Sequence, residues 1–208
     1  VKDEDVESDS VKSNGLIGRN LEDQYSRKMA NGSLNEYLKA NKIVSIEGVD
    51  TRELVSQIRT KGAMNCIISS ETTDLEVLKK KLAETPNMDG LELASKVSTA
   101  ASYELGDAKA DIRIAVMDYG VKKNILQCMV DRGAHVKVFP AKTPLDEVKK
   151  FQPHGYFISN GPGDPAPMGY AVATVKQILK EEKPLFGICL GHQLLALAND
   201  IPTFKMHH

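Results

Sequence analysis

Residues 185–193 have the sequence LFGICLGHQ and run on into LLALA at residues 194–198. The apolar beginning is typical of a short buried strand, and the leucine-rich end is typical of a helix. Cys189 lies between them, flanked by Gly187 and Gly191, where the chain must turn sharply from strand to helix. This pattern is that of a nucleophile elbow, in which the glycines let neighbouring backbone approach closely.

Cys189 has two interpretations. A lone cysteine is most often a buried structural residue, but a core cysteine does not need glycines on both sides at a strand–helix junction. The unpaired N–H groups and the dipole at a helix N-terminus favour a thiolate. We therefore expect Cys189 to be a nucleophile.

The composition limits the class of protein. The 208 residues are 41% hydrophobic, which predicts a soluble protein of one or two domains. Lys plus Arg (27) nearly balances Asp plus Glu (28), so no electrostatic footprint for nucleic acid is present. No apolar run has membrane-spanning length and no signal peptide is visible, so we expect no membrane partner.

The three cysteines are sparse and lack the spacing of metal ligands. They indicate a reducing cytoplasm, no disulfide framework and no metal site. Cys66 and Cys128 lie in apolar stretches, so we expect them in the core. The acidic start without Met and the end at His207 and His208 suggest a piece of a longer protein.

The second half of the chain alternates apolar strands with amphipathic helices. This order predicts a parallel sheet covered on both faces, with reactive groups at the carboxyl ends of the strands. The expected strands are residues 112–117, 135–139, 156–159 and 185–188, and the expected helices are 121–132, 145–150, 170–180 and the segment after Cys189.

The first half has a different character. Capping residues predict helices that begin after Ser33, Asp50 and Asp74. Short strands are expected at residues 43–46 and 66–68. A polar stretch at residues 98–109 is the expected linker, so we expect one domain at residues 1–105 and a second at 111–208.

A second informative segment, SNGPGDP at residues 159–165, follows the expected strand 156–159. Alone, it would be an ordinary Gly/Pro turn. Beside a nucleophile, a rigid loop of this kind can direct backbone N–H groups at a developing oxyanion. Its pairing with the elbow one strand later favours this second interpretation.

Together, these motifs resemble those of class I glutamine amidotransferases, in the cysteine segment 187–193 and the oxyanion loop 160–165. The Gly-Asp-Pro end of the loop 160–165 and the long apolar helix after Cys189 are similar to the matching segments of the small, glutamine-hydrolysing subunits of carbamoyl-phosphate synthases. DTREL at residues 50–54, KGAMN at 61–65 and DYGVKKNI at 118–125 also resemble that family. The resemblance implies an incomplete amino-terminal small-subunit domain followed by a truncated flavodoxin-like amidotransferase domain.

The resemblance also implies a role for each matching residue. Cys189 would attack the side-chain amide of glutamine and form a γ-glutamyl thioester. The backbone N–H groups of Gly161 and Leu190 would form the oxyanion hole, and Gly163 and Gln193 would help to hold glutamine. The ammonia would pass to a large subunit, which uses ATP, Mg and bicarbonate to make carbamoyl phosphate for the arginine and pyrimidine pathways. No cofactor is expected in this chain.

Several functional residues of the family have no counterpart here. The resemblance places the catalytic His and Glu beyond residue 208 and a pocket-lining serine before Val1. His192 lies three residues after Cys189, but its side chain need not face the thiol, so we expect a packing or supporting role. We assign no role to His135 or His154, and we expect the chain alone to be inactive.

Two other functions remain open. The chain could be the glutaminase component of another class I amidotransferase, such as those for anthranilate, GMP or CTP synthesis, although these are not expected to carry the segments at residues 50–54 and 61–65. It could also be a non-catalytic piece that binds the large subunit as part of a heterodimer.

Overall fold

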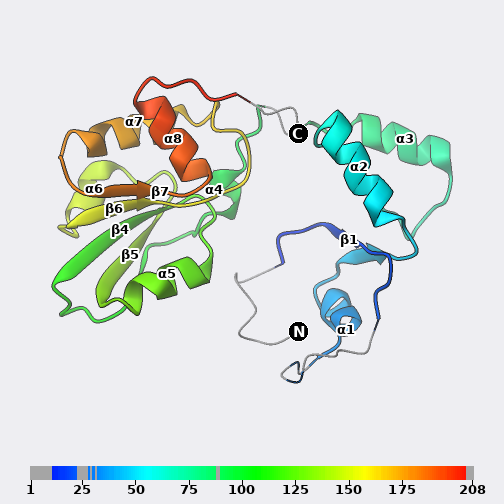
Figure 1. Ribbon diagram of the computed structural model, residues 1–208, viewed down its shortest axis with the longest axis horizontal. Coiled ribbons are helices and arrows are strands. Elements are labelled where there is room, and N and C mark those ends of the chain that lie inside the picture. The colour runs from blue at the N-terminus through cyan, green and yellow to red at the C-terminus, as the bar shows by residue number, and fades with distance from the viewer. Residues whose placement is uncertain (1–10, 23–27, 29, 31, 88–89, 205–208) are drawn as a thin grey trace. The chain divides into compact units, whose positions relative to one another are not determined.

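The structure is a computed structural model that describes residues 11–22, 28, 30, 32–87 and 90–204. The chain divides into two compact units, residues 1–87 and residues 88–204. Figure 1 shows the helices and strands of each unit. The acidic start of the chain, His207 and His208 lie outside the described residues.

The first unit contains a two-stranded parallel sheet and three helices. The strands are β1 (Gly15–Ile17) and β2 (Val44–Ile46), and the helices are α1 (Leu34–Ala40), α2 (Thr51–Lys61) and α3 (Leu75–Ala83). Each helix begins where a capping side chain accepts a backbone N–H, and these caps are Ser33, Asp50 and Asp74. The three predicted helix starts are therefore confirmed.

Two expectations for the first unit are wrong. Residues 66–68 form no strand and pair with none of the described strands, although the Ile68 side chain packs against Gly15 of β1. Cys66 is exposed rather than in the core. The apolar face of α2 is also open to solvent within the described residues, with Val55 52% exposed and Ile58 39% exposed.

The second unit is built on a five-stranded sheet in the order β3-β5-β4-β6-β7. Its strands are β3 (Tyr103–Leu105), β4 (Ile112–Asp118), β5 (Ala134–Pro140), β6 (Gly155–Ile158) and β7 (Leu185–Gly187). The helices are α4 (Ala94–Val97), α5 (Lys123–Val130), α6 (Leu145–Lys149), α7 (Gly169–Leu179) and α8 (Leu190–Ala198). β4 to β7 are parallel, in the order of a flavodoxin-like fold, so the predicted α/β class is confirmed.

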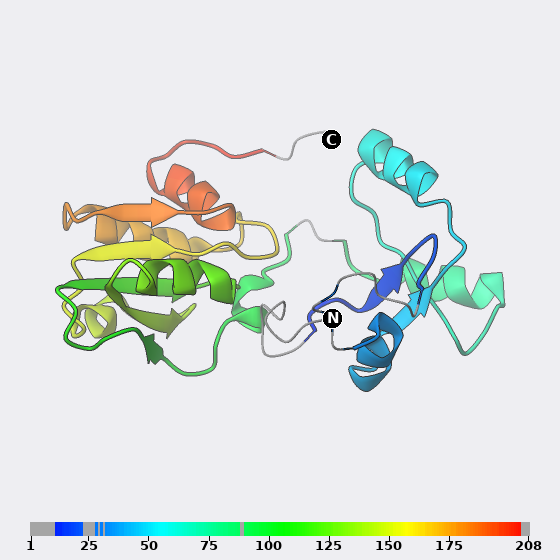
Figure 2. The same cartoon turned by 60° about the horizontal axis from the view of Figure 1, so that its bottom comes forward.

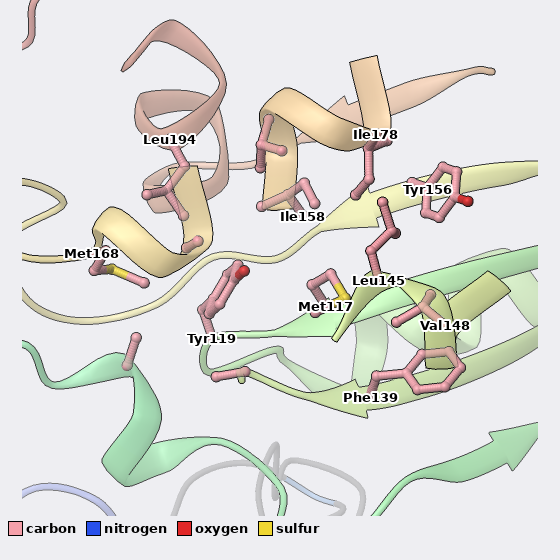
Figure 3. Packing of buried hydrophobic residues seen from close by; sticks show 14 of the residues in the cluster. Met117, Tyr119, Phe139, Leu145, Val148, Tyr156, Ile158, Met168, Ile178 and Leu194 are labelled. Carbon is pink, nitrogen blue, oxygen red and sulfur yellow. The ribbon is translucent and has the colours of Figure 1, made fainter. Parts of the chain in front are cut away.

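Helices cover both faces of this sheet, with α7 and α8 on one side and α5 on the other (Figures 1 and 2). The alternation along β4 explains this, because successive side chains in a strand point to opposite faces. Met117 packs in the core cluster under α6, α7 and α8, whereas its neighbour Val116 packs in the cluster under α5. Figure 3 shows the first of these clusters around Met117, Ile158 and Leu194.

The predicted linker at residues 98–109 is wrong, because part of it forms β3. This strand pairs antiparallel with β5. The Glu104 carboxylate also lies 2.9 Å from His135 Nε2 and 2.8 Å from Lys137 Nζ on β5. The second compact unit thus begins well before residue 111, while the assignment of residues 1–105 and 111–208 to two family domains stays a prediction.

Cys128 on α5 is exposed, which contradicts its expected place in the core. The buried stripe of α5 contains Leu126, with Ile125 and Met129 packed against the same cluster. Position 128 falls on the opposite side of the helix from Leu126.

Over the described residues, no helix is long and apolar enough to cross a membrane.

Candidate active site

The carboxyl ends of three adjacent strands bring the predicted site together. β4, β6 and β7 lie side by side in the sheet and run in the same direction. The turn at residues 118–121 overlaps and extends the end of β4, the loop 159–165 follows β6, and Cys189 follows β7. Segments that lie about 40 and 70 residues apart in the sequence therefore meet at one edge of the sheet.

Cys189 lies at the turn between β7 and α8, with φ 51° and ψ −110°. A non-glycine residue with positive φ is uncommon and costs free energy unless its surroundings impose it. This is the sharp strand-to-helix turn that the elbow pattern predicts. The thiol is exposed and forms no disulfide.

The two glycines beside Cys189 are required by close backbone packing. A Cβ at Gly187 would lie 2.6 Å from the Gly191 carbonyl oxygen. A Cβ at Gly191 would overlap the Ile158 carbonyl oxygen at the end of β6. The start of α8 therefore packs directly on β6 and β7, and this packing holds Cys189 in its strained conformation.

The N–H groups of Leu190 and Gly161 have no hydrogen-bond acceptor within the described parts of the chain. Leu190 is the first residue of α8, where backbone donors have no partner inside the helix. A Cβ at Gly161 would lie 2.9 Å from Leu190 Cδ2, so these two residues lie against each other. The structure thus places Gly161 against Leu190, the residue that follows Cys189, and each of the two has a free N–H group.

The other two predicted site residues lie near the same edge. Gly163 has φ +96°, and a Cβ there would lie 2.8 Å from the Leu91 carbonyl oxygen. Gln193 is exposed on the first turn of α8, and its N–H donates to the Cys189 carbonyl oxygen over 3.1 Å. That Gly163 and Gln193 hold a substrate stays a prediction.

Comparisons with known proteins identify the family of the chain. Residues 115–208 match the family described as glutamine amidotransferase class-I, and residues 1–68 match carbamoyl-phosphate synthase small chain, CPSase domain. A protein of Pectobacterium atrosepticum named carbamoyl phosphate synthase small chain is 45% identical over 98% of this chain. The chain belongs to the carbamoyl-phosphate synthase small-chain family.

Other members of the family show similar identity. Proteins of the same name from Pseudomonas syringae pv. tomato and Salmonella typhimurium are 44% and 42% identical over 99% and 98% of this chain. The aligned segment covers 58% of each of these relatives and of the Pectobacterium protein. The chain therefore spans about 58% of the length of the small chains that it matches.

None of the three histidines that the structure describes is placed to act as a base toward Cys189. His135, at the start of β5, is 5% exposed and binds Glu104, and His154, before β6, accepts the Arg113 N–H over 3.0 Å. Both lie at the amino ends of strands, opposite the edge that carries Cys189. His192 is exposed on α8 and has no hydrogen-bond partner among residues that the structure describes.

A tyrosine beside the loop is also unsuited to act as a base. Tyr119 is fully buried in the core cluster with Met168 and Leu194 (Figure 3), and burial raises the pKa of its hydroxyl. The group therefore stays neutral near pH 7.

No cluster of three or more His, Cys, Asp or Glu side chains that could hold a metal is found within the described ranges.

Sequence reasoning missed the residues that support the loop 159–165. Asp118 and Ser159 are buried polar residues whose hydrogen bonds hold the backbone around Gly161. The sequence DYG at residues 118–120 indicated only a resemblance to the family. Asp118 and Ser159 could have been found as polar residues at the carboxyl ends of otherwise apolar strands.

Proposed function

We propose that this chain carries the nucleophile and oxyanion donors of a glutamine-hydrolysing subunit of carbamoyl-phosphate synthase. The observation that carries the proposal is the position of Cys189 on a strained elbow whose next residue, Leu190, lies against Gly161. An activated nucleophile beside convergent backbone N–H donors is the arrangement that acyl transfer requires. The family match over both parts of the chain supports this choice over another class I amidotransferase.

The proposed reaction has two steps. The sulfur of Cys189 adds to the side-chain carbonyl carbon of glutamine, the carbon–nitrogen bond breaks, and the thiol proton leaves with ammonia. Water then adds to the γ-glutamyl thioester, the carbon–sulfur bond breaks, and glutamate leaves while the thiol regains its proton. The N–H groups of Gly161 and Leu190 stabilise the oxyanion of each tetrahedral intermediate, and Gly163 and Gln193 hold the glutamine.

The ammonia goes to a separate large subunit, which binds ATP, Mg and bicarbonate and makes carbamoyl phosphate for arginine and pyrimidine synthesis in the cytoplasm. The chain itself needs no cofactor, and its partners are glutamine and that large subunit. Its nearly balanced charge gives no attraction to nucleic acid or to an anionic membrane.

The direct test is Cys189→Ser in the complete small chain assembled with its large subunit. We expect glutamine-dependent carbamoyl phosphate synthesis to disappear and ammonia-dependent synthesis to persist, because only glutamine hydrolysis needs the thiol. Cys128→Ser is the matched control, since Cys128 is also an exposed free cysteine, and it should retain both activities. Loss of both activities in Cys189→Ser would show instead that Cys189 is structural, and retention of both would exclude it as the nucleophile.

We further propose that the 208-residue polypeptide alone turns over glutamine negligibly. General acid–base catalysis contributes about 10² to 10⁴ in rate, and none of the described histidines is placed to provide it to Cys189. The measurement is glutamate release from glutamine by the purified 208-residue chain. Release at the rate of an intact amidotransferase would contradict this proposal.

A further inference from the structure

Asp118 is a buried carboxylate at the end of β4 that forms no ion pair within the described residues. It is 4% exposed, and both of its oxygens accept backbone N–H groups. Oδ1 accepts from Gly120 over 2.8 Å and from Val121 over 2.9 Å, and Oδ2 accepts from Thr99 over 2.7 Å. A buried charge is tolerated when such hydrogen bonds compensate its lost hydration. Asp118 therefore ties the segment after α4 to the turn after β4.

The turn that Asp118 holds contacts the oxyanion loop. Tyr119 N–H donates to Ser159 Oγ over 2.8 Å, and Asn160 Nδ2 donates to the Gly120 carbonyl oxygen over 2.8 Å. A Cβ at Gly161 would overlap the Tyr119 carbonyl oxygen. The backbone of Gly161 is thus pressed against the Tyr119 peptide, so its position depends on that of the turn.

The segment on the other side of Asp118 holds the far end of the same loop. Asp164 N–H donates to the Leu91 carbonyl oxygen over 3.2 Å, and Asp164 Oδ2 accepts the Gly90 N–H over 3.0 Å. Residues 90–99 and 118–121 therefore hold the loop from two sides. The hydrogen bond from Thr99 to Asp118 joins these two supports.

We propose that Asp118 is a positioning residue for glutamine hydrolysis, whose carboxylate fixes the turn at residues 118–121 and so sets the position of the Gly161 N–H that receives the oxyanion. This inference rests on the proposed function. An oxyanion donor works only at about 2.7–3.1 Å from the developing charge. A shift of a few tenths of an ångström at Tyr119 is transmitted directly to Gly161, because no space separates the two backbones.

The test is Asp118→Asn in the complete small chain assembled with its large subunit. Asparagine keeps the shape of the side chain but replaces one acceptor oxygen with an NH2 group, so at least one of the three backbone donors faces another donor. We expect kcat for glutamine to fall about 10- to 100-fold, with KM for glutamine and ammonia-dependent synthesis changed less than about twofold. Asp131→Asn is the matched control: Asp131 is exposed at the end of α5 and bonds to Gln127, so both glutamine parameters should be unchanged.

Two probes separate positioning from a merely structural role. Alkylation of Cys189 by iodoacetamide develops no oxyanion, so its rate should stay within about twofold of the wild type. Glutamate γ-semialdehyde inhibits by adding to the Cys189 sulfur, and the oxygen of the tetrahedral adduct takes the position of the oxyanion. Its inhibition constant should therefore rise by about the same factor as kcat/KM falls. Equal losses in alkylation and turnover would overturn the proposal, because they would mean that the elbow itself is disturbed.

Ser159→Ala provides a second variant if Asp118→Asn does not fold. It removes the acceptor of the Tyr119 N–H with a small change in volume, and the same pattern of lower kcat with unchanged alkylation is expected. Unchanged kcat in a folded variant of either residue would overturn the inference. Retained glutamine-dependent synthesis in Cys189→Ser would instead refute the proposed function, whatever the Asp118 variant does.

Discussion

Gly191→Ala tests whether close packing at the start of α8 holds the elbow. The added Cβ would overlap the Ile158 carbonyl oxygen and lie 2.9 Å from the Ser159 carbonyl oxygen. Both obstacles are backbone atoms at the end of a central strand, so neither can move as a flexible side chain would. Overpacking of this kind costs about 1–3 kcal/mol, whereas alanine in a helix gains up to about 1 kcal/mol over glycine. We expect a net loss of about 1–2 kcal/mol in the free energy of unfolding.

The matched control is Gly169→Ala. Gly169 begins α7, and a Cβ there would have no atom within 4 Å. Alanine at this position therefore adds its higher helix propensity without a steric cost. Urea unfolding of the 208-residue chain, followed by near-ultraviolet circular dichroism of the buried tyrosines, measures both variants. With a urea m value of about 1–3 kcal/mol/M, the Gly191→Ala midpoint should fall by about 1 M. A Gly191→Ala midpoint equal to or above that of Gly169→Ala would refute the packing argument.

Two further results are expected. Burial disfavours the charged form of Glu181, but hydrogen bonds from Lys149 and Tyr156 outweigh this and lower the pKa below its ordinary value of 4.5. The resulting stability is therefore present above pH 4.5 and is lost as the pH falls through the lowered pKa. Glu181→Gln should be about 1 kcal/mol less stable at pH 7 and approach the wild type as the pH falls below 4.5 in thermal unfolding, and a gap independent of pH would contradict this. Phe186 is 64% exposed on the edge strand β7, so Phe186→Lys should reduce self-association of the 208-residue chain in light scattering. Phe204→Lys, at an 85% exposed position outside the sheet, should not, and equal effects would exclude the edge as the cause.

The sequence predicted the second unit well because its central strands β4, β5 and β6 are mostly buried and its helices are amphipathic. The eight elements from β4 to α8 that follow the alternation come from local patterns of this kind. The expectation for Cys128 failed because apolar neighbours in sequence were given more weight than the helical period, which places position 128 away from Leu126.

The strands β1 and β3 were not predicted, because each is three residues long and depends on a distant partner. β3 lies in a polar stretch, and its place in the sheet is fixed by pairing with β5 and by the contacts of Glu104 with His135 and Lys137. Nothing within the stretch itself indicates these interactions.

The sequence likewise predicted only part of the candidate site. Cys189 and its glycines were predicted because the elbow is encoded in adjacent residues. The support of Gly161 was not, because Asp118 and Ser159 act across separations of about 40 residues that only the folded sheet brings together.

The strand order also has a consequence for the folding of the chain during its synthesis on the ribosome. Chain order and sheet order agree on one side of β4, since β6 adds to β4 and β7 then adds to β6. Each new strand emerging during translation therefore finds a completed edge to join, and no earlier strand has to be displaced. The turn at Cys189 requires the end of β6 as a surface for Gly191, so the Cys189 thiol acquires its geometry only after β6 has joined the sheet.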